Sequence, residues 1–300
     1  MVPAMTGLGR GSAPGSARLL PVNEPFARQE LFDFVAARAI PGVEEADALS
    51  YRRSIASEGG ATVVTVDAGP AGIRLSTSRR SSLTEALVAG ISVMFGMDVD
   101  PHVVDRHLSG SRLLRPLVAR RPGLRVPGTL DPFELGVRAI LGQQVTVKGA
   151  STLAGRLVAA LGEPLETPAG TVTHLFPTPR HVAAADLSRI GMPQSRRDTV
   201  TRFAAAVAAG DVVLDRAADS RLGRRRLLAI QGIGPWTADY IAMRALRDPD
   251  AMPTGDLGLR RAIERLAPGS ELAAQSEAWR PWRAYAAMHL WASLADARPD

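Results

Sequence analysis

The sequence of 300 residues predicts two parts, a small α+β domain with an antiparallel sheet and a larger all-α domain built around a glycine hairpin between helices. Two observations lead to this fold class. Short segments that alternate apolar and polar residues, the period of a half-buried strand, occur before Asp98 and not after it. From Asp98 onward the apolar residues recur at helical spacing, between connectors rich in glycine and proline.

The first domain is expected over residues 22–97. Apolar residues on one face predict a helix over residues 27–39, and a second helix is expected over residues 83–95. Between them lie alternating segments separated by Gly-Gly and Gly-Pro turns, which favour an antiparallel meander. These predicted strands are residues 51–57, 61–67 and 73–78.

Residues 1–21 are rich in Gly, Ser, Ala and Pro and lack an apolar period, so a disordered tail is expected there. The segment also lacks the roughly 7–15-residue apolar stretch of a secretory signal. No later run reaches the roughly 18–20 apolar residues of a membrane span. These features predict a protein of the cytosol, with no membrane contact.

The second domain is expected over residues 98–300, with no internal repeat. Its periodic segments predict helices at residues 102–109, 132–145, 147–161, 193–209, 220–230, 235–246, 257–266 and 276–294.

Composition limits the chemistry. Cysteine is absent, which excludes disulfides, zinc–thiolate sites and cysteine-ligated clusters, and the five histidines show no ligand spacing. No cofactor held by side chains is therefore expected. The net charge is +6, and all basic residues except Lys148 are arginine. This excess suits phosphate binding, but a GC-rich genome would produce it too, and both explanations stay open.

The most informative motif is a tight glycine turn between two helices. One helix is expected to end at Ile230, Gly232 and Gly234 form the turn, and Pro235 opens the next helix at its favoured first position. Glycines there permit positive φ and close approach of a ligand, and the exposed N–H groups of a helix start favour an anion such as a DNA phosphate. The alternative is an ordinary helical hairpin with a glycine cap.

A carboxylate and several aromatic residues follow this turn. Asp256 precedes a predicted helix in the N-cap position, where it either only caps the helix or also serves chemistry through its fixed rotamer. Trp236 and Tyr240 lie four residues apart on one helix face, and Trp291 lies on the last helix. Aromatic faces can hold an extruded or cationic base, although core packing is the alternative. His289 is expected to be a hydrogen-bonded helix-face residue.

Gln231–Ala238 followed by Asp256 resembles the hairpin-plus-aspartate signature of the helix–hairpin–helix DNA glycosylase superfamily. Further stretches resemble its bacterial 3-methyladenine glycosylase II (AlkA-type) branch. They are residues 125–128 with 133–144, 176–179 with 190–193, and 279–291.

The resemblance implies a role for each matching position. Asp256 matches the catalytic aspartate of the family. The aromatic residues of the family's base pocket correspond to Trp236, Tyr240 and Trp291. The phosphate-binding hairpin, often with a monovalent cation on its backbone carbonyls, matches a segment that includes Gly232, Ile233, Gly234 and Thr237. Gln143 matches a residue that enters the minor groove. Two positions depart from the family pattern. Gln144 stands where the family has a leucine wedge, and Leu257 stands where an aromatic residue can follow the aspartate.

The function implied is a DNA glycosylase of base excision repair that acts on duplex DNA and excises alkylated purines of the 3-methyladenine and 7-methylguanine type. The resemblance also implies a monomer in the bacterial cytoplasm and nucleoid. An aspartate would stabilise the positive charge that develops on the sugar. Lyase-type relatives use a hairpin lysine as a nucleophile, and Trp236 occupies that neighbourhood, so no lyase activity is expected. The alternative function is a non-catalytic DNA-binding helix–hairpin–helix module, which would require neither Asp256 nor the aromatics.

Overall fold

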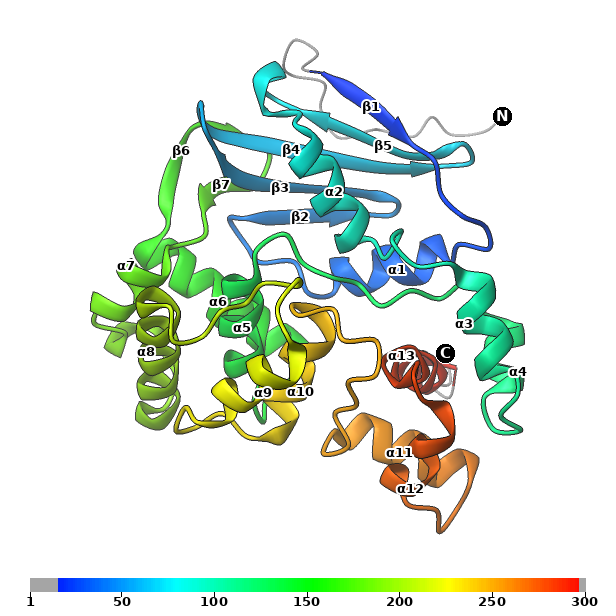
Figure 1. Cartoon of the computed structure of the whole chain (residues 1–300). Coiled ribbons are helices and arrows are strands. Elements are labelled where there is room, and N and C mark those ends of the chain that lie inside the picture. The colour runs from blue at the N-terminus through cyan, green and yellow to red at the C-terminus, as the bar shows by residue number, and fades with distance from the viewer. Residues whose placement is uncertain (1–15, 297–300) are drawn as a thin grey trace, which may run out of the picture.

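The computed structural model describes residues 16–296, except for the side chain of Arg80. Its N-terminal part contains a five-stranded sheet in which every neighbouring pair is antiparallel, with the order β1-β5-β4-β3-β2 (Figure 1). The strands are β1 Ala17–Leu20, β2 Glu44–Asp47, β3 Ser50–Ser57, β4 Gly60–Gly69 and β5 Gly72–Thr77.

Helices α1 (Arg28–Ala36) and α2 (Glu85–Met94) share one core with this sheet. Phe32 and Phe95 meet there with ring centroids 5.2 Å apart. The predicted α+β domain with its meander and two helices is therefore confirmed. β1 and β2 were not predicted, because each is a four-residue edge strand whose side chains show no clear alternation between buried and exposed positions.

Strand β1 also corrects the predicted tail. Residues 1–15 lie outside the described part of the chain, but Ala17–Leu20 pairs with β5 from Ala17 opposite Ser76 to Leu20 opposite Ile73. The expectation of disorder is wrong for this segment. Backbone pairing with a strand more than fifty residues away holds it, and composition carries no trace of that partner.

The remainder of the structure is mainly helical, with two 3₁₀ turns; a further 3₁₀ turn, η1, precedes α2 in the first domain. The helices are α3 Pro101–Leu108, α4 Arg115–Arg120, α5 Pro132–Leu141, α6 Val147–Leu161, α7 Pro179–Ala184, α8 Gln194–Ala209, α9 Ser220–Leu228, α10 Pro235–Arg244, α11 Leu257–Leu266, α12 Leu272–Ser276 and α13 Arg283–Ala295. The turns are η1 Arg80–Ser82, η2 Ser188–Ile190 and η3 Glu277–Trp279.

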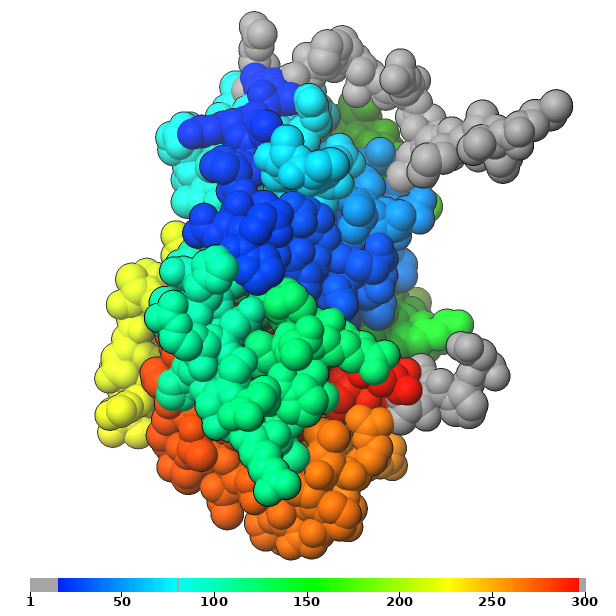
Figure 2. Space-filling model, turned by 90° about the vertical axis from the view of Figure 1, so that its right-hand side faces the viewer, coloured from blue at the N-terminus to red at the C-terminus, as the bar shows by residue number. Residues whose placement is uncertain are grey.

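Helix α10 connects two helical cores. Ala238 and Ile241 face a core built with α5, α6, α8 and α9, whereas Ala242 and Met243 face a core built with α3, α4, α11 and α13. Figure 2 shows the second group from outside, where the α3–α4 segment lies between the N-terminal domain and the α11–α12 segment. A side chain on the remaining face of α10 therefore lies where the two helical groups meet.

Two segments of the helical part differ from expectation. A hairpin of β6 (Glu163–Ala169) and β7 (Val172–Leu175) lies in a region expected to contain only helices. Its Leu165 and Val172 pack on Val63 of β4, so contact with the first domain stabilises it. The helix predicted over residues 276–294 is divided into η3 and α13, with Pro281 at the break, where proline has no N–H to donate.

Buried ion pairs fasten α5 to the sheet. Arg53 of β3 donates to Glu134 of α5 over 2.7 Å, and their side chains are 3 % and 2 % exposed. Glu44 of β2 lies 3.5 Å from Arg138, one turn further along α5, and accepts a hydrogen bond from Tyr51. Removing one member of a buried pair leaves an uncompensated charge, which costs about 3–5 kcal/mol. The sheet thus fixes the helix that carries Arg138.

His289 on α13 is buried, and neither ring nitrogen makes a hydrogen bond of good geometry among the described residues, although the Leu117 backbone makes a weaker polar contact with the ring. The expectation of a hydrogen-bonded histidine is met only by this weak contact. Burial, together with the charge of Arg121, lowers the pKa of His289 from 6.5 to about 4. The unfolded chain therefore binds the proton more tightly between these values. We expect the free energy of unfolding to fall by about 2 kcal/mol between pH 7 and pH 5 from this group alone.

Urea unfolding at the two pH values measures this effect. His289→Leu should lose that part of the pH dependence, whereas His102→Gln, at an exposed position, should retain it. Identical pH dependence in His289→Leu and the wild type would contradict the assignment.

Among residues 16–296, no helix is long and apolar enough to cross a membrane.

Candidate active site

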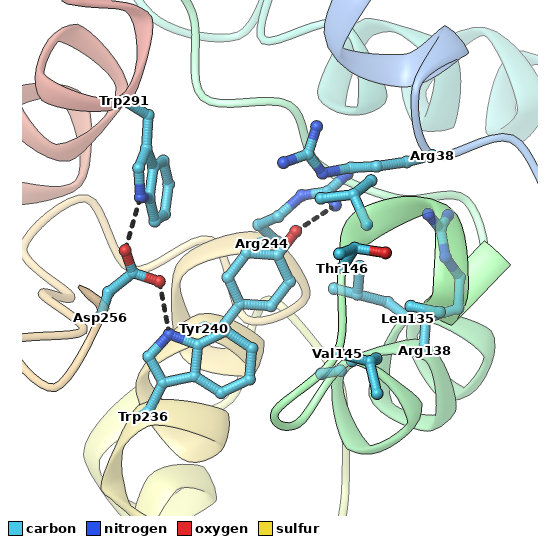
Figure 3. Close-up of a pocket in the computed structure, with 14 residues that line it drawn as sticks. Arg38, Leu135, Arg138, Val145, Thr146, Trp236, Tyr240, Arg244, Asp256 and Trp291 are labelled. Carbon is cyan, nitrogen blue, oxygen red and sulfur yellow. Dashed lines mark hydrogen bonds between the residues drawn. The ribbon is translucent and has the colours of Figure 1, made fainter. Parts of the chain in front are cut away.

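A cavity of about 280 Å³ opens beside α10, where segments from both domains meet (Figure 3). Its walls are formed by Arg38, just after α1, by α5 and the start of α6, and by α10. Asp256 at the start of α11 and Trp291 on α13 complete the lining. The charged and aromatic side chains of its lining are Arg38, Arg138, Trp236, Tyr240, Arg244, Asp256 and Trp291.

One wall of the cavity is aromatic. Trp236 and Tyr240 of α10 are stacked, with ring centroids 5.6 Å apart and planes 14° from parallel. Trp291 of α13 presents its edge to Tyr240, with centroids 6.4 Å apart. The structure thus brings together the three aromatic residues singled out in the sequence. They surround a space in which a planar, weakly solvated group can bind.

Asp256 lies at the same cavity as the N-cap of α11, as its position before the helix predicts. One carboxylate oxygen, Oδ1, accepts hydrogen bonds from the backbone N–H of Leu259 and from the indole Nε1–H of Trp291, both at 2.9 Å. The other oxygen, Oδ2, accepts from Nε1–H of Trp236 at 2.9 Å. The capping role and the place in the cavity therefore coexist (Figure 3).

Three guanidinium groups line the cavity as well, and the sequence analysis did not identify them. Arg244 donates to the Tyr240 hydroxyl over 2.9 Å and to the backbone carbonyls of Pro127 and Gly128. Arg38 stacks on the ring of Phe34, with its guanidinium carbon 3.6 Å from the ring centroid.

A partial signal for these arginines existed in the sequence. Tyr240 and Arg244 are four residues apart on one helix, so their contact could have been anticipated. Arg38 comes from the other domain and Arg138 from α5, and no local pattern brings them to α10. The same positive charges act on Tyr240: burial would raise the pKa of its hydroxyl, but the guanidinium groups outweigh this and lower it to about 8.

The glycine hairpin has the predicted backbone at one glycine only. Gly232 has φ +99°, and a Cβ there would lie 1.9 Å from Thr199 Oγ1, so no other residue fits without a shift. Gly234 has φ −91° and is the N-cap of α10; nothing described lies within 4 Å of a Cβ added there. The expectation of positive φ is therefore wrong for Gly234, which instead leaves the helix start uncovered.

The other residues assigned to the hairpin are mostly buried. Ile233 is 5 % exposed and Thr237 is 2 % exposed, so their side chains pack inside the protein. The Gln143 side-chain amide donates to the Gly232 carbonyl over 3.0 Å and to the Thr237 hydroxyl over 2.9 Å. Gln143 therefore ties the end of α5 to the hairpin, while its neighbour Gln144 is exposed and has φ +56°.

No group of three or more histidine, aspartate or glutamate side chains among residues 16–296 could hold a metal ion.

An antiparallel sheet domain, a glycine hairpin between helices and a carboxylate in an aromatic cavity define the class of helix–hairpin–helix proteins of base excision repair. Family models agree with this class: an AlkA N-terminal domain matches residues 17–131, and the HhH-GPD superfamily of base excision DNA repair proteins matches residues 137–284. The chain belongs to the AlkA-type branch of this superfamily.

Two curated relatives cover most of the chain. DNA-3-methyladenine glycosylase 2 of Escherichia coli is 34 % identical over 274 residues, which are 89 % of this chain and 94 % of the relative. A probable bifunctional transcriptional activator/DNA repair enzyme AlkA of Mycobacterium tuberculosis is 41 % identical over 281 residues. The alignment covers 92 % of this chain but only 56 % of that relative, so the chain spans about half the length of the mycobacterial protein.

Solved structures share the fold. A 3-methyladenine DNA-glycosylase from Archaeoglobus fulgidus superposes with a TM-score of 0.78 at 22 % identity, covering 92 % of this chain and 97 % of the other. An 8-oxoguanine glycosylase/lyase of Clostridium acetobutylicum in complex with double-stranded DNA gives a TM-score of 0.66 at 18 % identity, covering 85 % and 98 %. At these identities the likeness shows the fold alone.

Proposed function

We propose that this chain is a monofunctional DNA glycosylase that excises alkylated purines from duplex DNA, acting as a monomer in the bacterial cytoplasm. The observation that carries the proposal is a carboxylate, Asp256, fixed at an aromatic cavity next to a hairpin with an uncovered helix start. Membership of the base excision repair superfamily agrees with it.

The cavity provides what base excision requires. An extruded purine is planar, and the aromatic wall formed by Trp236, Tyr240 and Trp291 offers faces and edges against which it can stack. Bond cleavage builds positive charge on the sugar, and the negative charge of Asp256 stabilises it. Alkylation at N3 or N7 makes the purine a good leaving group, so one carboxylate without a second acid is sufficient.

The hairpin provides the attachment to DNA. The backbone N–H groups at the start of α10 are not covered by a side chain at Gly234, and a helix start favours a phosphate. Such contacts hold DNA irrespective of sequence. We assign to Gln144, exposed on the loop between α5 and α6, the role of filling the space that an extruded base leaves, where the family pattern has leucine.

We propose that the protein has no lyase activity because the hairpin contains no lysine that could act as a nucleophile. Lys148 is the single lysine of the chain and lies exposed on α6, between the cavity-lining Val147 and Ala150, although its own side chain does not line the cavity. Lys148 is far from the hairpin in sequence, but its neighbours Val147 and Ala150 bring it close to the cavity in space. The variant Lys148→Ala shows whether this amine takes part in the reaction.

Incubation with duplex DNA that contains 3-methyladenine or 7-methylguanine should release the free base and leave an intact strand with an abasic site. Borohydride should trap no covalent adduct at stoichiometric yield, and Lys148→Ala should excise like the wild type. Trapping that disappears in Lys148→Ala would contradict the monofunctional assignment. DNA binding without any base release would favour the non-catalytic module instead.

A further inference from the structure

We propose that Trp236 and Trp291 are positioning residues that orient the Asp256 carboxylate through their indole N–H groups, in addition to lining the base pocket. The inference rests on the proposed function, in which Asp256 is the catalytic anion. It differs from a stacking role, because stacking needs only the aromatic ring, whereas positioning needs the N–H group.

The donors reach the carboxylate from three separate elements. Trp236 belongs to α10, Trp291 to α13, and the Leu259 N–H to the first turn of α11, and all three hydrogen bonds are 2.9 Å long. Because both oxygens are held, the carboxylate cannot rotate about its Cβ–Cγ bond without breaking hydrogen bonds on both sides. A carboxylate has about four acceptor positions, so one remains for the substrate, on Oδ2.

The chemical nature of the donors matters as much as their number. None of the ion pairs found among residues 16–296 includes Asp256, although three arginines line the same cavity. Indole N–H is a neutral donor that cannot accept. It stabilises the ionised carboxylate without cancelling its charge, as a guanidinium partner would. The full negative charge of Asp256 thus stays available to a cationic sugar.

The indole of Trp236 is itself held in place. Its ring stacks on Tyr240, and the Tyr240 hydroxyl accepts a hydrogen bond from Arg244, which donates to two backbone carbonyls near residue 127. Trp291 is in edge contact with the same tyrosine. The aromatic wall and the carboxylate therefore form one connected assembly, in which the stacked rings set the direction of the N–H groups.

The decisive substitution removes the N–H and keeps the ring. Incorporating β-(3-benzothienyl)alanine at position 236 or 291 replaces the indole N–H by sulfur in a ring of nearly the same shape. A hydrogen bond to a charged group contributes about 1.5–3 kcal/mol, so each replacement should lower the single-turnover excision rate at saturating enzyme roughly 10- to 100-fold. The enzyme concentration at half-saturation should change little, because the stacking surface is intact.

A second readout is the enzyme concentration at half-saturation, which a loss of stacking would raise and a loss of the N–H group alone should leave unchanged. Trp279 offers a matched control: it is 1 % exposed, and its Nε1–H donates to Ser111 Oγ over 3.2 Å, away from Asp256. The same replacement at Trp279 should leave both the saturating rate and the half-saturation concentration unchanged.

The outcomes separate the two proposals. If the wild type is active and Asp256→Asn is not, yet the replacements at 236 and 291 keep the wild-type rate at saturating enzyme, then the tryptophans only stack and the positioning role is wrong. If the wild type releases no base, the proposed function itself fails. A reduced saturating rate with an unchanged half-saturation concentration at 236 and 291, and no change of either at 279, supports the inference.

Discussion

Asp256→Asn should reduce the release of methylated purines by roughly two to four orders of magnitude while duplex DNA is still bound. The substitution removes the negative charge that stabilises the sugar in the transition state and changes the side-chain volume little. Asparagine is also as good an N-cap as aspartate, so α11 should keep its first turn. Single-turnover base release measures the effect, and fluorescence anisotropy with a labelled duplex checks binding.

Hydrogen bonding adds to the loss. If the amide oxygen stays with the Leu259 N–H and the indole of Trp291, the amide NH₂ faces the Nε1–H of Trp236, and two donors oppose each other. Asp100→Asn is a matched control, because Asp100 caps α3 through His102 N–H at 2.9 Å and lies outside the cavity lining. It should excise like the wild type. Near-normal excision by Asp256→Asn would remove Asp256 from the mechanism.

Gly234→Asp should weaken binding to damaged and undamaged duplexes alike, by roughly 10- to 100-fold. The backbone at Gly234 suits any residue, there is open space for a side chain, and aspartate is a favoured N-cap, so the variant should fold. Its carboxylate would lie where the helix start attracts a phosphate. Repulsion between two such charges at surface distances amounts to about 1–3 kcal/mol, which corresponds to this loss of affinity.

Gly234→Asn is the matched control, since it has nearly the same shape and capping ability without the charge. It should bind much more tightly than Gly234→Asp, and the difference should shrink as salt is added. Anisotropy titrations at several salt concentrations, with thermal unfolding of each variant, provide the comparison. If Gly234→Asp folds and binds as tightly as the wild type, the hairpin has no part in DNA binding.

The local sequence predicts the features on which Asp256→Asn depends better than those on which Gly234→Asp depends. The capping position of Asp256 and the helix start at Pro235 were predictable, because N-caps and first-turn prolines depend on a few neighbouring residues. The shared helix face of Trp236 and Tyr240 was predictable from their spacing. The backbone conformation of Gly234 could not be predicted. Only one glycine of the turn has positive φ, and the spacing of the two glycines does not say which one.

Several other features could not be read from local patterns. β1 and the β6–β7 hairpin exist because distant strands or side chains cover them, and neither has the alternation of a longer strand. Gln143 was expected to reach into the minor groove. In the structure it is bonded to Gly232, 89 residues away, so the minor-groove role stays a prediction.

By itself the sequence determined the order of the main helices and strands, the glycine turn and the position of the carboxylate at a helix start, because each depends on hydrogen bonds or periodicity within a few residues. Only the tertiary structure decided what surrounds that carboxylate. Trp291 reaches Asp256 across 35 residues, and Arg38 arrives from the other domain. Such pairings are set by the packing of whole helices around α10, where burial of many side chains fixes geometry that no local spacing encodes.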